Sequence, residues 1–568
     1  MQKGLLTEKK WTSRSGRFEL AIIMALYFLL LAPIMPEVST YHSDECFYTD
    51  SATYMMQDKD WITPHYPDGS LRINKPIITY WTIAASYWIL GIDYFATRLP
   101  FLIAGCFTVL MGYALSRKLF EKSGSAVLTA VILVSNIQLI HISLRSTPDI
   151  LQCLFLNISL YGFVLLIFHN DTRLRNYIIA YVGAALAIET KGFLGFTTVF
   201  YAFVFVLCGP KTNRNIKNLI HAPTILVSAI LATWWFFLIY MKHGDTALSG
   251  FFQDQAGTGM DIEGSGFYVL SNLIDYSWGV FRHFMPWILL LLIGFVFTRK
   301  ESSDFAKRNK RAILFICGWF LFLLAIFING KMSRTRYLLP AYPMLSALVA
   351  SFLTEMFRHT SMLRVLRYAY SIFLILAGIC AIAFIGAGLW MESRILFAGV
   401  LLLLCSMMLY YFSFIKKKLE MSSALGINIL VAISVGYIFI IPTFRVSPSE
   451  KLTECILQSM DGKSKSISVW SKEKYKLTGQ INVLSKGRVS VFELPEGPLP
   501  DNLYQRPLVI LSEESKTGLN LSEYDVRPCG TVYRSVKPET VREVLKTGDP
   551  DMLFQSIKQH YYLAKKRG

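Results

Sequence analysis

The chain has 568 residues, of which 53% are hydrophobic and 17% are charged, and its mean hydropathy is +0.41. Because an ordinary soluble domain carries roughly 25% charged residues, this composition excludes a soluble protein and indicates a membrane protein with many spans. The charge is basic, with 57 Lys plus Arg against 39 Asp plus Glu, but the bases lie in short loops between apolar stretches. This placement favours an effect of membrane topology and argues against a nucleic-acid surface.

Apolar stretches recur along the first three quarters of the chain. A window of about 20 residues, the length that crosses the hydrocarbon core, predicts about 13 transmembrane helices. The division between two of them, around residues 189–195, is the least distinct. The predicted spans begin near Phe18, Thr97, Ser125, Ile150, Tyr177, Phe193, Leu219, Gly279, Ala312, Tyr337, Tyr368, Ile395 and Ala424.

Basic residues orient these spans. A cluster of bases precedes the first span, so we expect a cytoplasmic amino terminus. Strict alternation then puts later basic clusters, such as those in 299–311, 358–367 and 416–418, on the same side. The first span resembles a signal peptide, but no small-x-small cleavage site follows it, so we expect it to be retained.

The same alternation predicts two domains. Residues 1–442 form a membrane domain, whose first outer loop, 37–96, carries an interfacial helix at 77–90. Residues 443–568 form a small outer α/β domain. There "SISVW", "INVLS", "RVSVFEL" and "PLVILS" are predicted strands, and "PETVREVLKTG" and "DMLFQSIKQHYYLAKK" are predicted helices. Cys455 and Cys529 lie in this domain and could form a disulfide in an oxidising compartment.

Carboxylates from distant parts of the chain are predicted at the outer face. Asp44 and Glu45 follow the first span, and Asp149 follows the third. Any one carboxylate at the end of a span is commonly just solvated, and a cation there commonly snorkels to the interface. The combination is more informative, because several cations break the positive-inside tendency, and a phosphate at headgroup depth would explain them. These cations are Lys75, Lys191, Arg282, Lys331, Arg334 and Arg336.

Five segments between residues 18 and 350 then carry a resemblance. They read "DECFYTDSATYMMQDKDWITPHYPDGSLRINKPIITYW", "FATRLPFLIAG", "RSTPD", "ETKGFLGF" and "RYLLPAYP". In this order they resemble the aminoarabinose transferase branch of the GT-C membrane glycosyltransferases, which is related to the protein O-mannosyltransferases. The resemblance implies a polytopic α-helical GT-C fold, a polyprenyl-phosphate (undecaprenyl phosphate-type) sugar donor and no nucleotide sugar.

The resemblance also implies roles for individual residues. It makes Asp44 catalytic, with Glu45 beside it, and Asp149 a second essential carboxylate. It places Lys75 and Lys191 near the lipid phosphate; we add the outward cations Arg282, Arg334 and Arg336 to that set. One departure is Asn74, which stands where the family commonly has Glu, and it puts the identity of the sugar in question.

The expected reaction is a single displacement that inverts the anomeric carbon. We expect lipid A as the acceptor and an aminoarabinose-like sugar as the transferred group. A protein hydroxyl or another glycan is the alternative acceptor. No metal or other cofactor is expected, and the protein is predicted to be a monomer in the bacterial inner membrane, with its active site and C-terminal domain in the periplasm. A transporter or flippase for a lipid-linked sugar is the alternative from another class, but it would need ionisable groups near the midplane.

Other signals have simpler interpretations. Asp58 and Asp60 form a DxD sequence, which is short and common. His42, Asp44 and His65 could bind a metal, but such loop histidines are usually incidental. Glu189 could pair with Lys191. Tyr337 and Tyr342 are expected to be interfacial belt residues.

Overall fold

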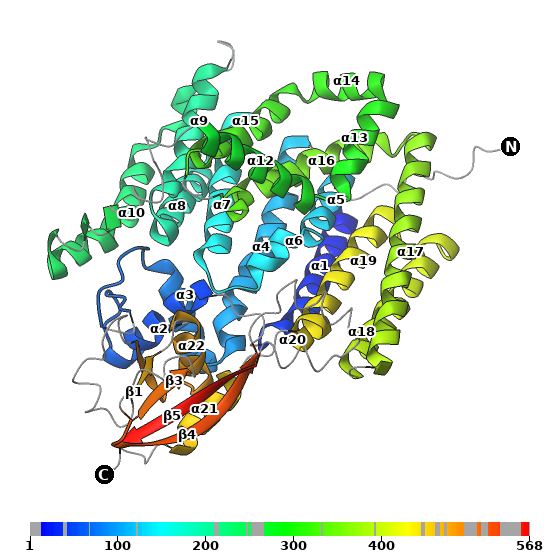
Figure 1. The fold of residues 1–568 in the computed structure, drawn as a ribbon. Coiled ribbons are helices and arrows are strands. Elements are labelled where there is room, and N and C mark those ends of the chain that lie inside the picture. Colours follow the sequence, from blue (N-terminus) through cyan, green and yellow to red (C-terminus); the bar gives the residue numbers. More distant parts are fainter. Residues whose placement is uncertain are drawn as a thin grey trace.

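The computed structural model is a helical assembly with a small sheet at one end (Figure 1). It describes residues 13–37, 43–66, 69–120, 123–209, 215–245, 248–249, 251–252, 266–330, 333–390, 393–417, 419–444, 449–459, 466–470, 474–493, 508–512, 521–533 and 558–566.

Within this described part, nine helices are long and apolar enough to cross a membrane, or up to 11 spans if each of two bent pairs counts as one. The nine are α1 (Ser13–Leu31), α4 (Tyr94–Phe120), α7 (Pro148–Phe168), α10 (Ala222–His243), α15 (Lys310–Phe327), α16 (Tyr342–Met356) with the 3-10 segment η6 (Thr335–Ala341), α17 (Thr360–Trp390), α18 (Ser393–Tyr410) and α19 (Met421–Val435). The bent pairs are α5 (Ser123–Val134) with α6 (Ile137–Ser143), at 64°, and α12 (Gly266–His283) with α13 (Trp287–Phe297), at 91°.

With each bent pair counted as one span, the described residues hold two fewer candidate spans than the predicted count of about 13. The two remaining predicted spans correspond to α8 (Leu174–Lys191) and α9 (Phe196–Cys208), which flank the indistinct division at 189–195. Helix α8 carries Arg175, Glu189 and Lys191, and α9 has only 13 residues. Charge and shortness thus keep both helices from qualifying as ordinary spans.

Shorter elements complete the helical part. The first loop contains α2 (Ser43–Asp58) and α3 (Ile78–Leu90), so a helix does form at 77–90 as predicted. The others are η1 (Ala32–Ile34), η3 (Phe193–Gly195), η5 (Ile216–Leu219), α14 (Arg299–Arg308), the π-helical segments η7 (Tyr411–Ile415) and η8 (Gly436–Ile440), and α20 (Ile441–Phe444).

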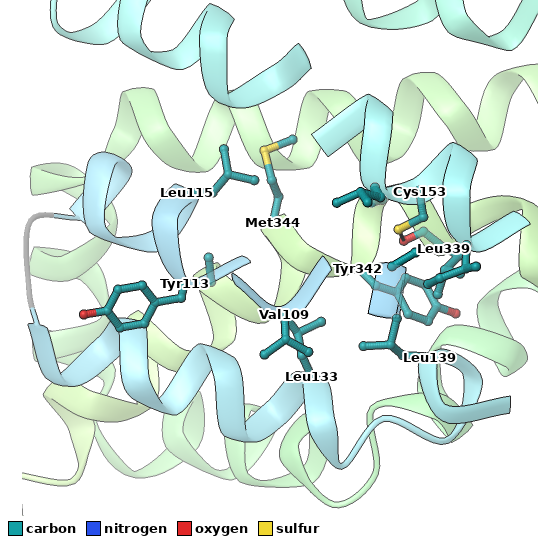
Figure 2. Close-up of a cluster of buried hydrophobic side chains, with 14 of the residues drawn as sticks. Val109, Tyr113, Leu115, Leu133, Leu139, Cys153, Leu339, Tyr342 and Met344 are labelled. Carbon is teal, nitrogen blue, oxygen red and sulfur yellow. Dashed lines mark hydrogen bonds between the residues drawn. The ribbon is translucent and has the colours of Figure 1, made fainter. Parts of the chain in front are cut away.

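An apolar core joins the helices that will carry the site. Figure 2 shows side chains from α4, α5, α6, α7, η6 and α16 meeting in one cluster, which includes Val109, Leu133 and Tyr342. Helices α7 and α8 pack closely because of two glycines. A Cβ on Gly162 would lie 2.5 Å from the backbone nitrogen of Ala180, and one on Gly183 would lie 2.8 Å from that of Ser159. This close approach keeps α7 and α8 packed against each other along their middle turns.

The C-terminal region contains a five-stranded mixed sheet in the order β2-β1-β3-β5-β4. Strand β1 (Ser466–Trp470) is parallel to β2 (Ser490–Glu493) and β3 (Leu508–Ser512), whereas β5 (Lys558–Lys566) is antiparallel to β3 and β4 (Tyr524–Tyr533). Two helices, α21 (Ser449–Ser459) and α22 (Lys474–Leu484), accompany the sheet. A disulfide joins Cys455 to Cys529, so these cysteines do pair.

Two predicted elements of this region are wrong. The "INVLS" segment lies mainly in helix α22, where Val483 packs against Cys46 and Tyr94 of the membrane domain. The end of "DMLFQSIKQHYYLAKK" is strand β5 and not a helix, because it pairs with strands on both sides. The "PETVREVLKTG" segment lies outside the described residues.

Helix α22 docks on α2. Within the contact, the buried Asn482 amide Nδ2 donates to Asp50 Oδ1 at 2.8 Å. Gln57 Nε2 donates to the carbonyl of Gly487 at 2.9 Å. The sheet therefore lies at the same end of the molecule as α2 and α3, and α14 lies at the opposite end (Figure 1).

Candidate active site

Helices α7 and α8 bring the first two charged groups together. Thr147 is extended and Pro148 opens α7, so Asp149 lies in the first turn, where the helix dipole favours a carboxylate. Lys191 lies in the last turn of α8, which ends at Gly192 with φ +82°. Lys191 Nζ donates to Asp149 Oδ1 at 2.5 Å. The glycine-terminated "TKG" turn thus aims a lysine at the start of the neighbouring helix.

Arg336 connects this pair to the first loop. It lies in η6, and its Nη2 donates to Asp44 Oδ2 at 2.9 Å, while its Nε lies 3.7 Å from Asp149 Oδ2. The second distance is too long for a hydrogen bond, and Nε has no hydrogen-bond partner among the described residues. Asp44, Asp149, Lys191 and Arg336 form what we call the charge cluster. Side chains that are up to 292 positions apart in the sequence meet there.

The charge cluster borders a pocket with about 290 Å³ of empty space, including its open mouth. Three of its members line the pocket on one side, and mainly apolar side chains line the rest. The lining residues are Asp149, Gln152, Leu156, Lys191, Leu194, Leu323, Phe327, Arg336, Tyr337 and Pro340. Cations beside an apolar wall suit a ligand that has both an anionic group and a hydrocarbon part.

Exposure separates the two acids of the charge cluster. The Asp149 side chain is 4% exposed and contacts both cations, whereas the Asp44 side chain is 31% exposed and contacts Arg336. Asp149 can therefore hold the cations in place. Asp44 is the more accessible of the two acids.

Glu45 occupies a different environment from Asp44. It is fully buried and accepts from Arg98 Nε at 3.1 Å and from the Ser146 hydroxyl at 3.0 Å. Arg98 also donates to the carbonyls of Met35 and Glu37, both at 2.8 Å. Glu45 thus ties α2 to α4 and to the turn before Asp149. Its predicted catalytic role stays a prediction, and its contacts favour a positioning role.

Comparisons with known proteins show similarity in sequence and in fold. Residues 74–237 match the dolichyl-phosphate-mannose-protein mannosyltransferase family. An uncharacterized protein of Aquifex aeolicus (strain VF5) is 28% identical over 346 residues, which cover 59% of this chain and 65% of that protein. The undecaprenyl phosphate-alpha-4-amino-4-deoxy-L-arabinose arabinosyl transferase of Yersinia enterocolitica serotype O:8 / biotype 1B (strain NCTC 13174 / 8081) is 25% identical over 390 residues, which cover 66% of each chain. The matches therefore span just under two thirds of these relatives' own length.

The structural match covers more of the chain than the sequence matches do. The crystal structure of ArnT from Cupriavidus metallidurans bound to undecaprenyl phosphate has a TM-score of 0.67 to this chain at 17% identity, covering 96% of this chain and 97% of that one. The apo form of the same protein gives a TM-score of 0.66. The chain therefore has the ArnT fold. Its sequence is distantly similar to the undecaprenyl-phosphate-dependent arabinosyl transferases.

Three other predicted phosphate ligands are not among the residues that line the pocket. Lys75 Nζ donates to the carbonyl of Asn74 at 3.0 Å. Arg282 lies in the last turn of α12. The Arg334 backbone N–H donates to the Tyr276 hydroxyl at 3.2 Å, at the start of η6. The structure does bring the predicted cations Lys191 and Arg336 to the acids, and Lys331 lies outside the described residues.

The DxD sequence has a structural explanation. Asp60 pairs with Lys242 at the end of α10 and accepts from the backbone amides of Ile62 and Thr63. These bonds outweigh the effect of burial and lower the pKa of Asp60 to about 2. Asp60 therefore joins the first loop to α10. His42 lies outside the described residues, and Lys191 pairs with Asp149 and not with the fully buried Glu189.

Two tyrosines near the pocket were predicted to be interfacial belt residues. Tyr337 lines the pocket, with Lys191 Nζ 4.5 Å from its ring centroid, and Tyr342 is buried and hydrogen-bonded to His283 at 2.8 Å. The prediction is therefore wrong for Tyr342, and for Tyr337 it stays a prediction. Gln152 was not predicted at all, although its position three residues after Asp149 puts it on the same face of α7.

Proposed function

We propose that this protein is a GT-C glycosyltransferase, which transfers a sugar from a polyprenyl-phosphate donor of the undecaprenyl type to an envelope acceptor at the outer face of the membrane. The observation that carries the proposal is the convergence of two acids and two cations, from four distant segments, at one partly apolar pocket. Cations suit the phosphate of such a donor, and an apolar wall suits its hydrocarbon chain.

The charge cluster fits a direct displacement. The bond between the anomeric carbon and the phosphate oxygen breaks as the acceptor oxygen bonds to the opposite face of that carbon, which inverts its configuration. Negative charge grows on the departing polyprenyl phosphate, where Lys191 and Arg336 can stabilise it. The Arg336 Nε–H has no acceptor among the described residues and offers a further donor. Asp44 accepts the proton of an incoming hydroxyl, or orients an acceptor that is already ionised.

The finer parts of the proposal follow the relatives. The arabinosyl transferase of Yersinia enterocolitica supports an aminoarabinose-like sugar, and we propose lipid A as the acceptor. We further propose a monomer in the bacterial inner membrane, with the active site and residues 443–568 in the periplasm. The proposed donor carries the sugar as a substrate, so the reaction as written needs no metal or other cofactor.

A second candidate is a protein O-mannosyltransferase-like reaction. The match of residues 74–237 to the dolichyl-phosphate-mannose-protein mannosyltransferase family favours it, as does Asn74 in place of the acid of the aminoarabinose branch. In this case the acceptor is a protein hydroxyl, and Asp44 serves as its general base.

Mass spectrometry of cells with and without the gene tests the acceptor. We expect lipid A of the deletion strain to lose one sugar substituent, with envelope glycans and glycoproteins unchanged. Loss of a sugar from glycoproteins alone would support the second candidate. If lipid A, envelope glycans and glycoproteins were all unchanged, both proposed acceptors would be contradicted. Transport of the lipid-linked sugar without release of polyprenyl phosphate would identify a flippase.

Replacing Lys191 by Ala should weaken donor use more than folding. Asp149 would keep Arg336 nearby, but the lysine that directly faces the pocket would be lost. A charged hydrogen bond contributes about 1.5–3 kcal/mol, so kcat/KM for the donor should fall by about 10- to 100-fold, measured by titration with undecaprenyl-phosphate sugar.

Lys310→Ala, at the exposed start of α15, is a matched control that removes a lysine at the opposite end of this helix from the pocket residue Phe327. It should leave donor kinetics unchanged. Unaltered donor kinetics in Lys191→Ala would contradict the phosphate assignment.

A further inference from the structure

Gln152 is a buried amide without a partner. It lies on α7 three residues after Asp149 and is 2% exposed. Neither its Oε1 nor its Nε2 has a hydrogen-bond partner among the described residues, although Gln152 lines the pocket. Leaving a donor and an acceptor buried and unpaired is destabilising, and such groups usually have a reason.

The walls of the pocket do not supply the missing partner. Leu156, Leu194, Leu323 and Phe327 present hydrocarbon to it. The charged side chains that line the pocket contact one another, with Lys191 bound to Asp149 and Arg336 beside it. A partner for the amide would therefore arrive with a ligand.

We propose that Gln152 recognises a hydroxyl group of the transferred sugar. This inference rests on the proposed glycosyltransferase function and deepens it. A side-chain amide offers two N–H donors and an acceptor oxygen. A phosphate near neutral pH offers mainly acceptors and an ammonium offers only donors, so each would leave one half of the amide unpaired. A hydroxyl both donates and accepts, and it alone of the three satisfies both Oε1 and Nε2.

The position of Gln152 separates it from the phosphate ligands. On a helix with 1.5 Å rise per residue, Gln152 lies about 4.5 Å further along α7 than Asp149. The donor phosphate would face Lys191 and Arg336, and the sugar would turn one ring hydroxyl towards α7. Gln152 is then a specificity-determining residue for the sugar, distinct from the residues that hold the phosphate.

A double-mutant cycle between the protein and the donor tests this contact. The probes are undecaprenyl-phosphate-linked aminoarabinose and mannose and their monodeoxy analogues, each lacking one ring hydroxyl. With the parent protein, one analogue should show kcat/KM reduced by about 10- to 100-fold, because its binding leaves the amide unpaired. In Gln152→Leu, kcat/KM for the complete sugar should fall by a similar factor. This variant should then use the complete sugar and that analogue with similar kcat/KM.

The outcomes separate the inference from the function on which it rests. The role of Gln152 would be overturned if Gln152→Leu kept the kcat/KM of the parent protein, or if it still discriminated against the monodeoxy analogue. Either result would leave the proposed transferase function intact. Failure of the parent protein to release polyprenyl phosphate from any of the probes would remove the proposed function and the inference with it.

Thermal unfolding of the purified protein excludes a purely structural role. Because Gln152→Leu removes two unpaired polar atoms from a buried site, its Tm should equal or exceed that of the parent protein. Gln138→Leu, on the half-buried face of α6, is the matched control and should change neither Tm nor discrimination. A lower Tm for Gln152→Leu that accounts for its lost activity would overturn the inference.

Discussion

Replacing Asp44 by Asn should reduce the rate of sugar transfer by about 10²- to 10⁴-fold, the contribution typical of a general base. Asparagine has nearly the same shape and keeps an oxygen that can accept from Arg336 Nη2. It cannot take a proton from an acceptor hydroxyl. The rate is measured as polyprenyl phosphate released by protein in detergent, and folding is checked by Tm and elution volume.

Two variants of the same helix control this prediction. Asp58→Asn changes an exposed acid at the other end of α2 and should leave the rate unchanged. Glu45→Gln weakens the buried bonds to Arg98 and Ser146, so it should reduce the yield of folded protein more than the rate per folded molecule. Full activity of Asp44→Asn with a hydroxyl acceptor would contradict the assignment of the base.

The sequence predicted the helical architecture well where apolar length was the deciding feature. Each predicted span start lies at or near a helix, because in a membrane the backbone must satisfy its own hydrogen bonds. The count differs at α8, because a helix that carries charged residues such as Glu189 and Lys191 is less apolar than an ordinary span, and at α9, which has only 13 residues. A hydropathy window therefore does not distinguish a helix that carries charged residues from a helix that faces lipid.

The C-terminal α/β region was predicted less accurately, since local propensity was overridden by tertiary contacts. The alternating "INVLS" segment is typical of a strand, yet it lies mainly in α22, where Asn482 bonds to Asp50 of α2. Strand β5 has residues with helical spacing but gains ladder bonds on both edges. Neither contact is visible in a local window.

The charged residues of the candidate site could be predicted from the sequence, but its neutral polar residue, Gln152, could not. Asp44, Asp149, Lys191 and Arg336 could be predicted because ionised groups at a membrane boundary on the outer side are unusual. Their pairing depends on the packing of α7 against α8 and η6, which no single segment encodes. Gln152 gives no such signal, since one amide in an apolar helix matters only once its neighbours are known.

Replacing Arg336 by Gln should have the second largest effect. This guanidinium contacts Asp44 through Nη2 and lies beside Asp149 through Nε, so one side chain serves both acids. Loss of a fixed donor to a developing anion reduces rates by about 10²- to 10³-fold. Removing one partner of a buried pair should also lower the free energy of unfolding, by about 3 kcal/mol. Transfer assays and thermal unfolding measure the two effects separately.

Arg336→Lys and the double variant Arg336→Gln/Asp149→Asn distinguish the two effects. Lysine keeps the charge, but its single ammonium group does not reproduce the planar fork that reaches two acids, so transfer should stay impaired. The double variant removes the carboxylate left without Arg336, so it should recover much of the lost stability. It should not recover transfer, because the phosphate still lacks its guanidinium. Recovery of transfer by the double variant would mean that Arg336 serves only to neutralise Asp149, and the phosphate would then need another ligand.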